Sequence, residues 1–347
     1  MEGIIEAVET EVEVEEIPLL TEEDSQPQYD KKPDRQTRSA MERKRKLNNN
    51  LFCWFIGGIP FIGFLLFTLV PMLISFYLSF TRLSSYNFLH STWIGFQNYI
   101  DLFKDKMFYK AIGNTLYALL AVPLTLTAGM LIGLLLRSKV VKGKFAWRII
   151  FFIPYLCSGV VLATTFSWMF DAEFGVINGV LKSLGLPKLG FFRDARMFMP
   201  TMFVMMVWNM MGSSGLQFYA ALGAVPKEIL EAAELDGANA RQRFFKITFP
   251  LVSPTTFYLF TTGLIAGLQT FVLFQMIGSS LGTIFGGPFG PSDTAITVVY
   301  YLYICSFTWL FRFGIGYGSA MSWVLAILVI LLTILNFKLQ KKWVQYD

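Results

Sequence analysis

Residues 223–250, GAVPKEILEAAELDGANARQRFFKITFP, form a polar stretch between two long apolar runs at 197–222 and 251–277. Each run is long enough for a helix to cross the hydrocarbon core of a bilayer, which needs about 20 apolar residues. The polar stretch carries too much charge to insert into lipid, and its helix and turn signals make it too structured for a plain connector. We therefore expect an ordered loop at one membrane surface.

The loop has the signals of two short helices joined by a turn. Pro226 suits the first position of a helix, and Glu228 complements the positive end of that helix's dipole. Gly237 can adopt a positive φ and end the helix, and Asn239 can cap the next one. Pro250 then opens the following apolar run.

Outward from this loop, the sequence contains six apolar stretches without an Asp, Glu, Lys or Arg. Backbone groups in lipid must form hydrogen bonds within their own segment, so these stretches are predicted to be helices. Their internal prolines predict kinks rather than breaks. The stretches are 51–80, 112–136, 149–170, 197–222, 251–277 and 313–337.

The basic residues predict the orientation, because Lys and Arg near helix ends prefer the cytoplasm. With six spans and both termini inside, 20 Lys and Arg lie in cytoplasmic segments and 8 in outer loops. Residues 294–311 are apolar enough to be a seventh span, but that span would place the basic C-terminus outside. We expect 294–311 to be a helix that packs at the outer surface or re-enters against the protein.

Composition supports a membrane protein and excludes a soluble enzyme, a disulfide scaffold and a nucleic-acid-binding module. The chain is 54% hydrophobic and 15% charged, whereas soluble domains carry about 25% charged residues. Residues 1–30 hold 11 of the 24 acidic residues and no Lys or Arg. We therefore divide the chain into a cytoplasmic tail, 1–50, acidic and then basic and expected to be disordered at its start, and a six-span membrane domain, 51–347, that includes the loop 223–250.

The sequence lacks the residues needed for metal binding, for nucleotide binding by a P-loop and for ion-coupled transport. One histidine and three dispersed cysteines offer no metal-ligand spacing. No P-loop motif is present, so this chain cannot bind nucleotide phosphates through one, and energy for any uphill transport would have to come from another subunit. The spans lack an ionisable residue at mid-depth, which argues against ion coupling and favours an uncharged, hydroxyl-rich solute.

The loop resembles a known motif. Glu231-Ala232-Ala233, then Gly237, Ile247 and Pro250 match the EAA loop of binding-protein-dependent ABC importer permeases in type and spacing. Phe249 stands where that family usually has leucine and keeps an apolar side chain there. Five fixed residue types over 20 positions, in a loop between spans, make this a specific match.

The resemblance covers about residues 50–347 and is greatest to the sugar branch of the family, the maltose-type and glycerol-phosphate-type permeases. Further matching segments are WIGFQNYIDLF at 93–103, Asn114-Thr115, Ile153-Pro154-Tyr155, GGP at 286–288 and GYGSAMSWVL at 316–325. It implies an all-α, type I importer permease that is not itself an enzyme and that transmits movement from separate ATPase subunits. The implied coupling residues are Glu231, Ala232, Ala233, Glu234, Asp236, Gly237, Ile247 and Pro250.

The same resemblance implies the partners and the location. They are a second, homologous permease in a heterodimer, two ATPase subunits that bind ATP and magnesium, and an extracellular or periplasmic solute-binding protein. The chain would be a multi-pass protein of the bacterial plasma membrane, with no cofactor of its own and no nucleic-acid partner.

A hydroxyl-bearing substrate needs polar groups and aromatic faces at mid-membrane depth. One face of the fourth span carries amides and a hydroxyl at helical spacing, and the fifth span adds glycines that either allow close helix packing or leave room for a sugar ring. Tyr155, Ser213 and Thr270 fall on family contact positions, whereas Gly263 and Gly267 stand where the maltose-type relative is polar. The candidates are Tyr155, Asn209, Ser213, Gln217, Gly263, Gly267, Gln269 and Thr270, with Thr262 beside them.

These observations lead to a permease subunit of an ATP-driven importer of a sugar or related polyol. Two other classes remain open at this point: an ATP-independent secondary carrier or channel for a neutral solute, and a membrane scaffold that transports nothing. The sequence contains neither an ion-coupling residue within a span nor an inverted repeat, which disfavours the carrier or channel. The ordered cytoplasmic loop disfavours the scaffold.

Overall fold

The structure is a computed structural model that describes residues 55–83, 91–138 and 140–345. The predicted tail at 1–50 lies outside these residues. Residues 55–70 and 71–347 are separate compact units, and every contact described below lies within the second.

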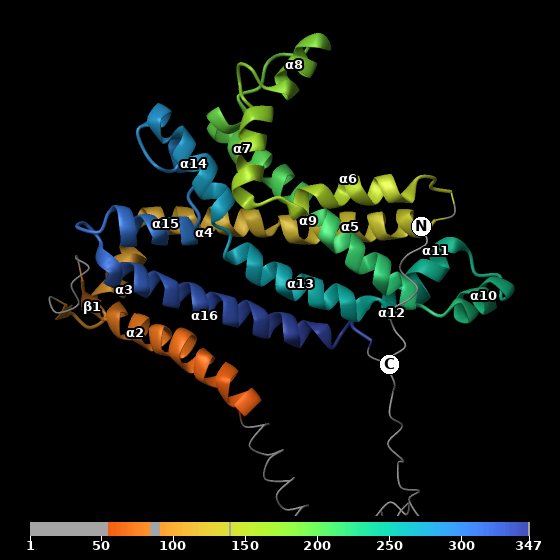
Figure 1. Cartoon of the computed structure of the whole chain (residues 1–347), viewed down its shortest axis with the longest axis horizontal. Helices are drawn as coiled ribbons and strands as arrows, with labels where there is room; N and C mark the ends of the chain where they lie inside the picture. The colour runs from red at the N-terminus through yellow and green to blue at the C-terminus, as the bar shows by residue number, and fades with distance from the viewer. Residues whose placement is uncertain (1–54, 84–90, 139, 346–347) are drawn as a thin grey trace, which may run out of the picture. The chain divides into compact units, whose positions relative to one another are not determined.

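The described elements are mostly helices, with η marking 3-10 and π turns, and they are coloured along the chain in Figure 1. The first are η1 (Leu65–Leu69), α2 (Val70–Ser79), β1 (Thr81–Arg82), β2 (Thr92–Trp93), α3 (Gln97–Lys104), α4 (Lys106–Leu119), α5 (Ala121–Arg137), α6 (Lys144–Leu156), α7 (Gly159–Met169), α8 (Val176–Ser183) and η3 (Phe191–Arg193). Next come α9 (Ala195–Ala224), α10 (Lys227–Leu235), α11 (Ala240–Arg243), η4 (Phe244–Thr248), α12 (Phe249–Leu251), α13 (Ser253–Leu268), α14 (Val272–Phe285), η5 (Pro291–Asp293), α15 (Val298–Tyr303), η6 (Ile304–Thr308) and α16 (Gly314–Gln340).

The helical membrane fold is confirmed, with fewer clear spans among the described residues than expected. In the described part of the chain, four helical stretches are long and apolar enough to cross a membrane, namely Phe55–Ser79, Lys106–Arg137, Ser253–Gly282 and Gly314–Gln340, and the bent pair α6–α7 raises the number to five. The predicted fourth span is α9, a continuous helix of 30 residues. It extends about 45 Å at 1.5 Å per residue, but its amides, serines and glycines lower its mean hydropathy.

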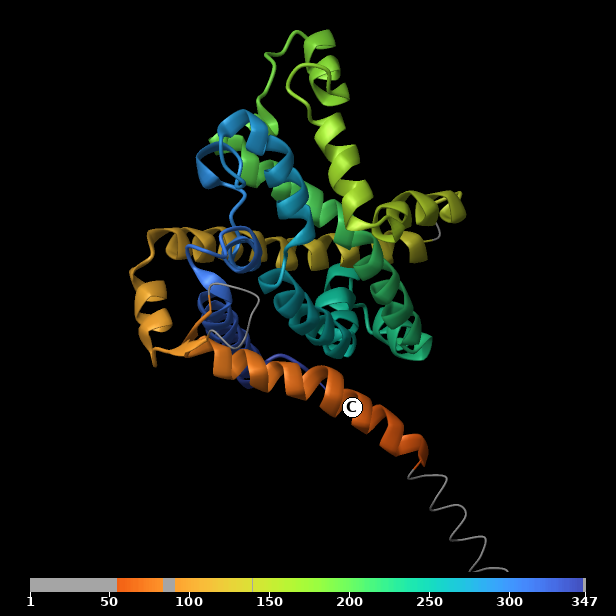
Figure 2. The ribbon, with the colours of Figure 1, turned by 60° about the vertical axis from the view of Figure 1, so that its left-hand side comes forward.

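The predicted third span, 149–170, is wrong as a single kinked helix. The chain bends by 106° between α6 and α7. Figure 2 shows the change of direction between the yellow and yellow-green helices. Pro154 has no N–H and its ring crowds the preceding turn, which weakens the end of α6. Ser158 then takes an extended conformation and caps α7, because its Oγ accepts the N–H of Val161. A proline together with a new cap produces a break.

Close packing of α5 against α9 forms the centre of the bundle. A Cβ built on Gly129 would lie 2.6 Å from the Cβ of Ser214, and one built on Gly133 would lie 3.0 Å from the Cβ of Phe218. The two glycines are four residues apart and so share one face of α5. Because glycine has no side chain, the backbones of α5 and α9 can approach each other closely. Small residues have the same role at many helix interfaces in membrane proteins.

Residues 294–311 contain only a short apolar helix, Val298–Thr308, which is too short to cross a bilayer. Most of its side chains are buried or half-buried against the rest of the protein, with Tyr300 and Tyr301 each 1% exposed. The segment therefore packs into the fold, in agreement with the expectation that it is not a seventh span.

Two of the segments that carried the resemblance meet at the β1–β2 pair. The Asn98 amide donates to the carbonyls of Ser79 and Thr81, both at 2.9 Å. Gly316 lies against the Thr81 carbonyl so closely that a Cβ would collide with it. The WIGFQNY and GYGSAM segments thus contact the same turn of backbone.

Candidate functional site

The loop between α9 and α13 has the predicted helix–turn–helix structure. α10 begins at Lys227, so Pro226 occupies the cap rather than the first helical position. Gly237 has a φ of +80° directly after the helix. The Ala238 N–H donates to the Ala233 carbonyl at 2.9 Å and the Gly237 N–H to the Glu234 carbonyl at 3.0 Å. This pair of bonds is the Schellman ending of a helix, and glycine supplies its left-handed residue.

A second set of local bonds fixes α11. The Asn239 side chain accepts the Gln242 N–H, and the Gln242 side chain accepts the Asn239 N–H, both at 2.9 Å. This reciprocal pair is a capping box. An ion pair between Arg243 and Glu234 then joins α11 to α10. The two helices form a rigid hairpin at the end of α9 (Figure 1).

The first part of this hairpin is exposed. No residue of α10 is buried, and the apolar side chains of Ile229 and Leu235 are 45% and 89% exposed. Glu231, Ala232, Glu234, Asp236 and Gly237 are exposed and Ala233 is half-buried, whereas Ile247 and Pro250 are half-buried near the spans. The predicted coupling residues therefore divide into an outward set and a set at the base of the loop.

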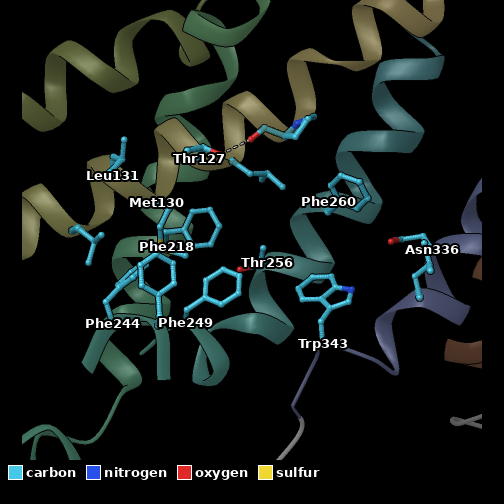
Figure 3. Close-up of a pocket in the computed structure, with 15 residues that line it drawn as sticks. Thr127, Met130, Leu131, Phe218, Phe244, Phe249, Thr256, Phe260, Asn336 and Trp343 are labelled. Carbon is cyan, nitrogen blue, oxygen red and sulfur yellow. Dashed lines mark hydrogen bonds between the residues drawn. The ribbon is translucent and has the colours of Figure 1, made fainter. Parts of the chain in front are cut away.

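Aromatic side chains connect the loop to the spans. A cavity of about 790 Å³ is lined by residues of α5, α9, η4, α12, α13 and α16 and by Trp343. Figure 3 shows its lining side chains, among them Phe244, Phe249 and Trp343. The rings of Phe244 and Phe249 are 6.3 Å apart. None of the predicted substrate residues lines this cavity. Phe249, the departure from the family pattern, serves here as an apolar contact between the loop and the bundle.

The α6–α7 break is stabilised by a predicted substrate residue. In a continuous helix the Pro154 carbonyl would accept the Ser158 N–H, and the break frees it. The Asn209 Nδ2 of α9 donates to that carbonyl at 2.9 Å. Tyr155, the next residue, is 54% exposed. The structure thus places Tyr155 and Asn209 at one irregular point of the backbone.

A second break separates α13 from α14 at Gln269, Thr270 and Phe271. Phe271 has φ −138° and ψ −63°, so the helix cannot continue through it. The Thr270 carbonyl is thereby freed and accepts the Thr297 hydroxyl at 3.1 Å. Gln269 is exposed and Thr270 half-buried. As at the first break, a side chain from another element forms a hydrogen bond with the freed backbone carbonyl. Irregular backbone is tolerated inside a membrane protein when its polar groups are bonded in this way.

The two breaks lie next to each other. A Cβ built on Gly159, at the start of α7, would lie 3.1 Å from the Val272 Cγ1 at the start of α14. Interrupted membrane helices mark substrate sites in many transporters, because the open backbone supplies polar groups at depth. This pair of breaks is the best candidate for a substrate pathway in the described part of the chain.

The remaining candidates have other contacts. Gly263 and Gly267 pack closely, since built Cβ atoms would lie 2.8 Å from Val122 and 2.9 Å from Leu119, so close helix packing is the use that the structure shows for both. The Ser213 hydroxyl donates within its own helix, to the Met210 carbonyl at 3.1 Å. Gln217 and Thr262 are exposed.

A half-buried polar centre around Asp105 was not predicted from the sequence. Its Oδ1 caps α4 by accepting the Met107 N–H at 2.8 Å. Its Oδ2 accepts the hydroxyl of Tyr317, at 2.8 Å, and that of Tyr301. One carboxylate therefore joins α4, α15 and α16. The position of Asp105 before an amphipathic helix signals the cap, but no local signal reveals the two tyrosines.

The Asn114-Thr115 pair has a related task. The Asn114 amide donates to the carbonyls of Thr294 and Ile296, at 3.2 and 2.9 Å, and the Thr115 Oγ1 accepts the Val298 N–H at 3.0 Å. These bonds fix the segment that leads into α15. They explain structurally why this pair belonged to the resemblance.

Within the described residues, no group of three or more His, Cys, Asp or Glu side chains could hold a metal ion. The polar groups at the two breaks are neutral amides, hydroxyls and carbonyls. They can form hydrogen bonds with a hydroxyl-bearing solute.

Comparison with known proteins agrees with this geometry. Residues 117–343 match the family model described as "Binding-protein-dependent transport system inner membrane component". The probable ABC transporter permease protein YesP of Bacillus subtilis is 34% identical over 313 residues, which cover 89% of this chain and 96% of YesP. The arabinooligosaccharides transport system permease protein AraP of Halalkalibacterium halodurans is 32% identical over 79% of this chain and 83% of its own length.

The fold also matches a solved structure. A chain of a bacterial ABC transporter involved in the import of the acidic polysaccharide alginate superposes with a TM-score of 0.70 at 22% identity, over 87% of this chain and 99% of that one. The family match covers well over half of the sequence and includes both helix breaks and the loop 223–250. This chain therefore belongs to the family of binding-protein-dependent transport system inner membrane components, the permeases of ABC transporters.

Proposed function

We propose that this chain is the membrane-spanning subunit of an ATP-driven importer of a neutral oligosaccharide or a related polyol. The exposed α10 hairpin carries the proposal, because a rigid, unburied helix with two outward apolar side chains is suited to a protein partner. The name of the arabinooligosaccharide relative supports the substrate class. The neutral polar groups at the two breaks agree with an uncharged solute.

The α10 hairpin would transmit the movement of an ATPase subunit to the spans. The outward set, from Glu231 to Gly237, would meet the ATPase, and Ile247 and Pro250 would join the loop to α13. The Schellman ending, the capping box and the Arg243–Glu234 pair make the hairpin stiff. A stiff element passes on a displacement as a rigid body rather than absorbing it.

The complete transporter would contain partners for each remaining task. Two ATPase subunits would bind ATP and magnesium, a second homologous permease would complete the pathway, and a solute-binding protein would deliver the sugar to the outer loops. The family's description as binding-protein-dependent supports the last of these. We place both termini in the cytoplasm of a bacterial cell, because Lys and Arg concentrate on that side.

The two adjacent breaks would serve as the moving part of the pathway. Alternating access requires helices that can change direction around a substrate site. Tyr155, Asn209, Gln269 and Thr270 lie at or beside the breaks, where a sugar could exchange hydrogen bonds with them. Ser213 and Gln217 continue the Asn209 face of α9 toward the coupling loop.

Uptake by the assembled transporter in proteoliposomes tests the proposal. Glu231→Lys should leave the amount of permease unchanged and lower ATP-dependent uptake by about tenfold or more, because opposed like charges at an interface cost several kcal/mol. Gly237→Pro should have the same effect, because proline cannot adopt a φ of +80° and removes the N–H donated to Glu234.

Glu173→Lys, the same charge reversal on an exposed residue of the loop between α7 and α9, is the matched control. Undiminished uptake by both loop variants would remove the coupling role. Sugar uptake without any ATPase subunit would instead establish a secondary carrier or a channel.

A further inference from the structure

A second cavity, which has polar groups in its lining, lies at the opposite end of α9 from the coupling loop. It has a volume of about 210 Å³ and lies between the ends of α7 and α14 and the turn η3. η3 immediately precedes α9, whereas α10 follows it, so the 30-residue length of α9 separates this cavity from the hairpin. Figures 1 and 2 show α7 and α14 side by side with α8 beyond them. In the proposed orientation this cavity is on the outer side.

The loop that forms one wall, residues 171–194, is held in a fixed shape. Asn178 is buried, with 2% of its surface exposed. Its side-chain amide donates to the carbonyls of Asp171, Ala172 and Leu189. Its Oδ1 accepts the Leu189 N–H at 2.9 Å. One buried amide thus ties both ends of the loop together. A wall fixed before a ligand arrives lowers the entropy cost of binding.

The lining combines charged, hydroxyl and aromatic groups. Arg193 donates to the Asp171 Oδ2 at 3.2 Å, and both side chains line the cavity. Ser167 and Ser280 contribute hydroxyls, and Phe170 and Phe192 contribute rings. Among the described residues, the Ser167 hydroxyl and the other N–H groups of Arg193 have no hydrogen-bond partner. The cavity therefore holds unused donors and acceptors beside aromatic surface.

We propose that this cavity binds one neutral glycosyl unit of the transported oligosaccharide before the sugar reaches the helix breaks. The inference rests on the proposed function and adds a site that is separate from those breaks. A sugar ring has hydroxyls that both donate and accept, and apolar C–H faces that pack on aromatic rings. Asp171 accepts, Arg193 donates, and the two serines do either.

The charge of the site selects a neutral ligand. Asp171 and Arg193 compensate each other, so the cavity has no net charge from its lining. A carboxylated or phosphorylated sugar would compete with Asp171 for Arg193 and would leave the aspartate unpaired. A neutral ring can bridge the two side chains without separating them.

Binding to the permease without its solute-binding protein tests the inference. The permease–ATPase complex would be placed in nanodiscs, and the radiolabelled neutral oligosaccharide that the complete transporter takes up from a panel would be titrated by equilibrium dialysis. Arg193→Gln should weaken binding about tenfold, the loss expected for one hydrogen bond from a charged donor. Ser167→Ala should weaken it about threefold, the loss expected for one neutral bond.

Lys188→Gln is the matched control. It removes a cation from the same loop, where Lys188 pairs with Glu173 at 3.1 Å outside the cavity lining. It should leave binding unchanged. Ser167→Ala keeps the test decisive if Arg193→Gln alters the loop, because the lost hydroxyl has no partner among the described residues.

Each outcome supports or overturns the inference. Weaker binding by both cavity variants, with the control unchanged, supports the subsite. A sugar that the complete transporter takes up, but that does not bind the permease complex or binds both variants as tightly as the wild type, overturns the subsite and leaves the proposed function intact. Absence of any sugar uptake by the complete transporter overturns both.

Discussion

The α10–α11 hairpin and the segment that contains α15 are both short helical structures between spans, and they are stabilised in opposite ways. The polar contacts of the hairpin are local, such as the Asn239–Gln242 capping box three residues apart. Those of the α15 segment reach across the sequence, with Asn114 and Ile296 separated by 182 positions. No residue of α10 or α11 is buried, whereas Tyr300 and Tyr301 are.

This difference fits two tasks. A surface that must meet another protein cannot depend on tertiary contacts on the side where the partner binds, so its shape has to come from caps and a glycine. A segment that holds helices in place inside a bundle must instead bond to several of them. Variants in the two regions should therefore differ in whether they affect global stability or only local order.

The largest effect is expected for Asp105→Leu. Two buried tyrosine hydroxyls would lose their charged acceptor and α4 its cap, a combined cost of about 3–5 kcal/mol. The unfolding free energy, measured by SDS titration in mixed micelles, should fall by that amount. Asp105→Asn retains an acceptor and should cost about 1–2 kcal/mol, since neutral bonds are roughly half as strong. A leucine variant as stable as the wild type would show that Asp105 does not hold the segment.

Gly237→Ala should have a smaller and local effect. A residue with a side chain at φ +80° costs about 1–2 kcal/mol, and nothing else surrounds this position within 4 Å. Hydrogen exchange of the Gly237 and Ala238 amides should accelerate while global unfolding is unchanged. Gly179→Ala, at an open helical position of α8 with ordinary φ, should leave exchange unaffected. A global loss of stability from Gly237→Ala would contradict the contrast between the two regions.

The smallest effect concerns the outer loop 171–194, which combines local bonds with an ion pair. The Phe174 N–H, the Glu173 N–H and Arg193 hold the pKa of Asp171 below its ordinary 3.8, although partial burial opposes them. The group stabilises the loop above pH 3.8, and that stabilisation is lost as the pH falls through the lower, folded value. The charged neighbours are Arg193, Glu173 and Lys188.

Pepsin, which is active at low pH, provides the measurement. Cleavage within 171–194 should increase below pH 3.8 in the wild type. Asp171→Asn should already be cleaved faster at pH 4–5, because it lacks the ion pair at every pH. Equal cleavage of the two proteins at pH 4–5 would show that the charge of Asp171 does not order the loop.

The same contrast explains what the sequence could predict. Gly237 and Asn239 revealed the ends of α10 and α11 because capping depends on residues within one turn. The spans followed from length and apolarity, but the break after Pro154 did not. That break depends on Asn209, 55 positions away, which satisfies the freed carbonyl.

The second break and the Asp105 centre could not be predicted from the sequence either, because both depend on partners far away along the chain. Thr297 stabilises the opened backbone at Thr270, and Tyr301 and Tyr317 come to Asp105 from about 200 positions away. Neither hydrophobic periodicity nor the spacing of motifs predicts such long-range pairs. Gly263 and Gly267 were noticed in the sequence, but it allowed either close helix packing or room for a sugar ring. Only their contacts with Val122 and Leu119 show that they serve helix packing.

Contact between α10 and an ATPase subunit is the step on which the proposed transport mechanism depends most. A photo-reactive amino acid at Ala232, an exposed position of α10, would test that contact directly in the assembled transporter. We predict a light-dependent covalent product with the ATP-binding chain, and no such product from the same amino acid at Leu186 in the outer loop. Cross-linking to the ATPase from Leu186 but not from Ala232 would contradict the central claim.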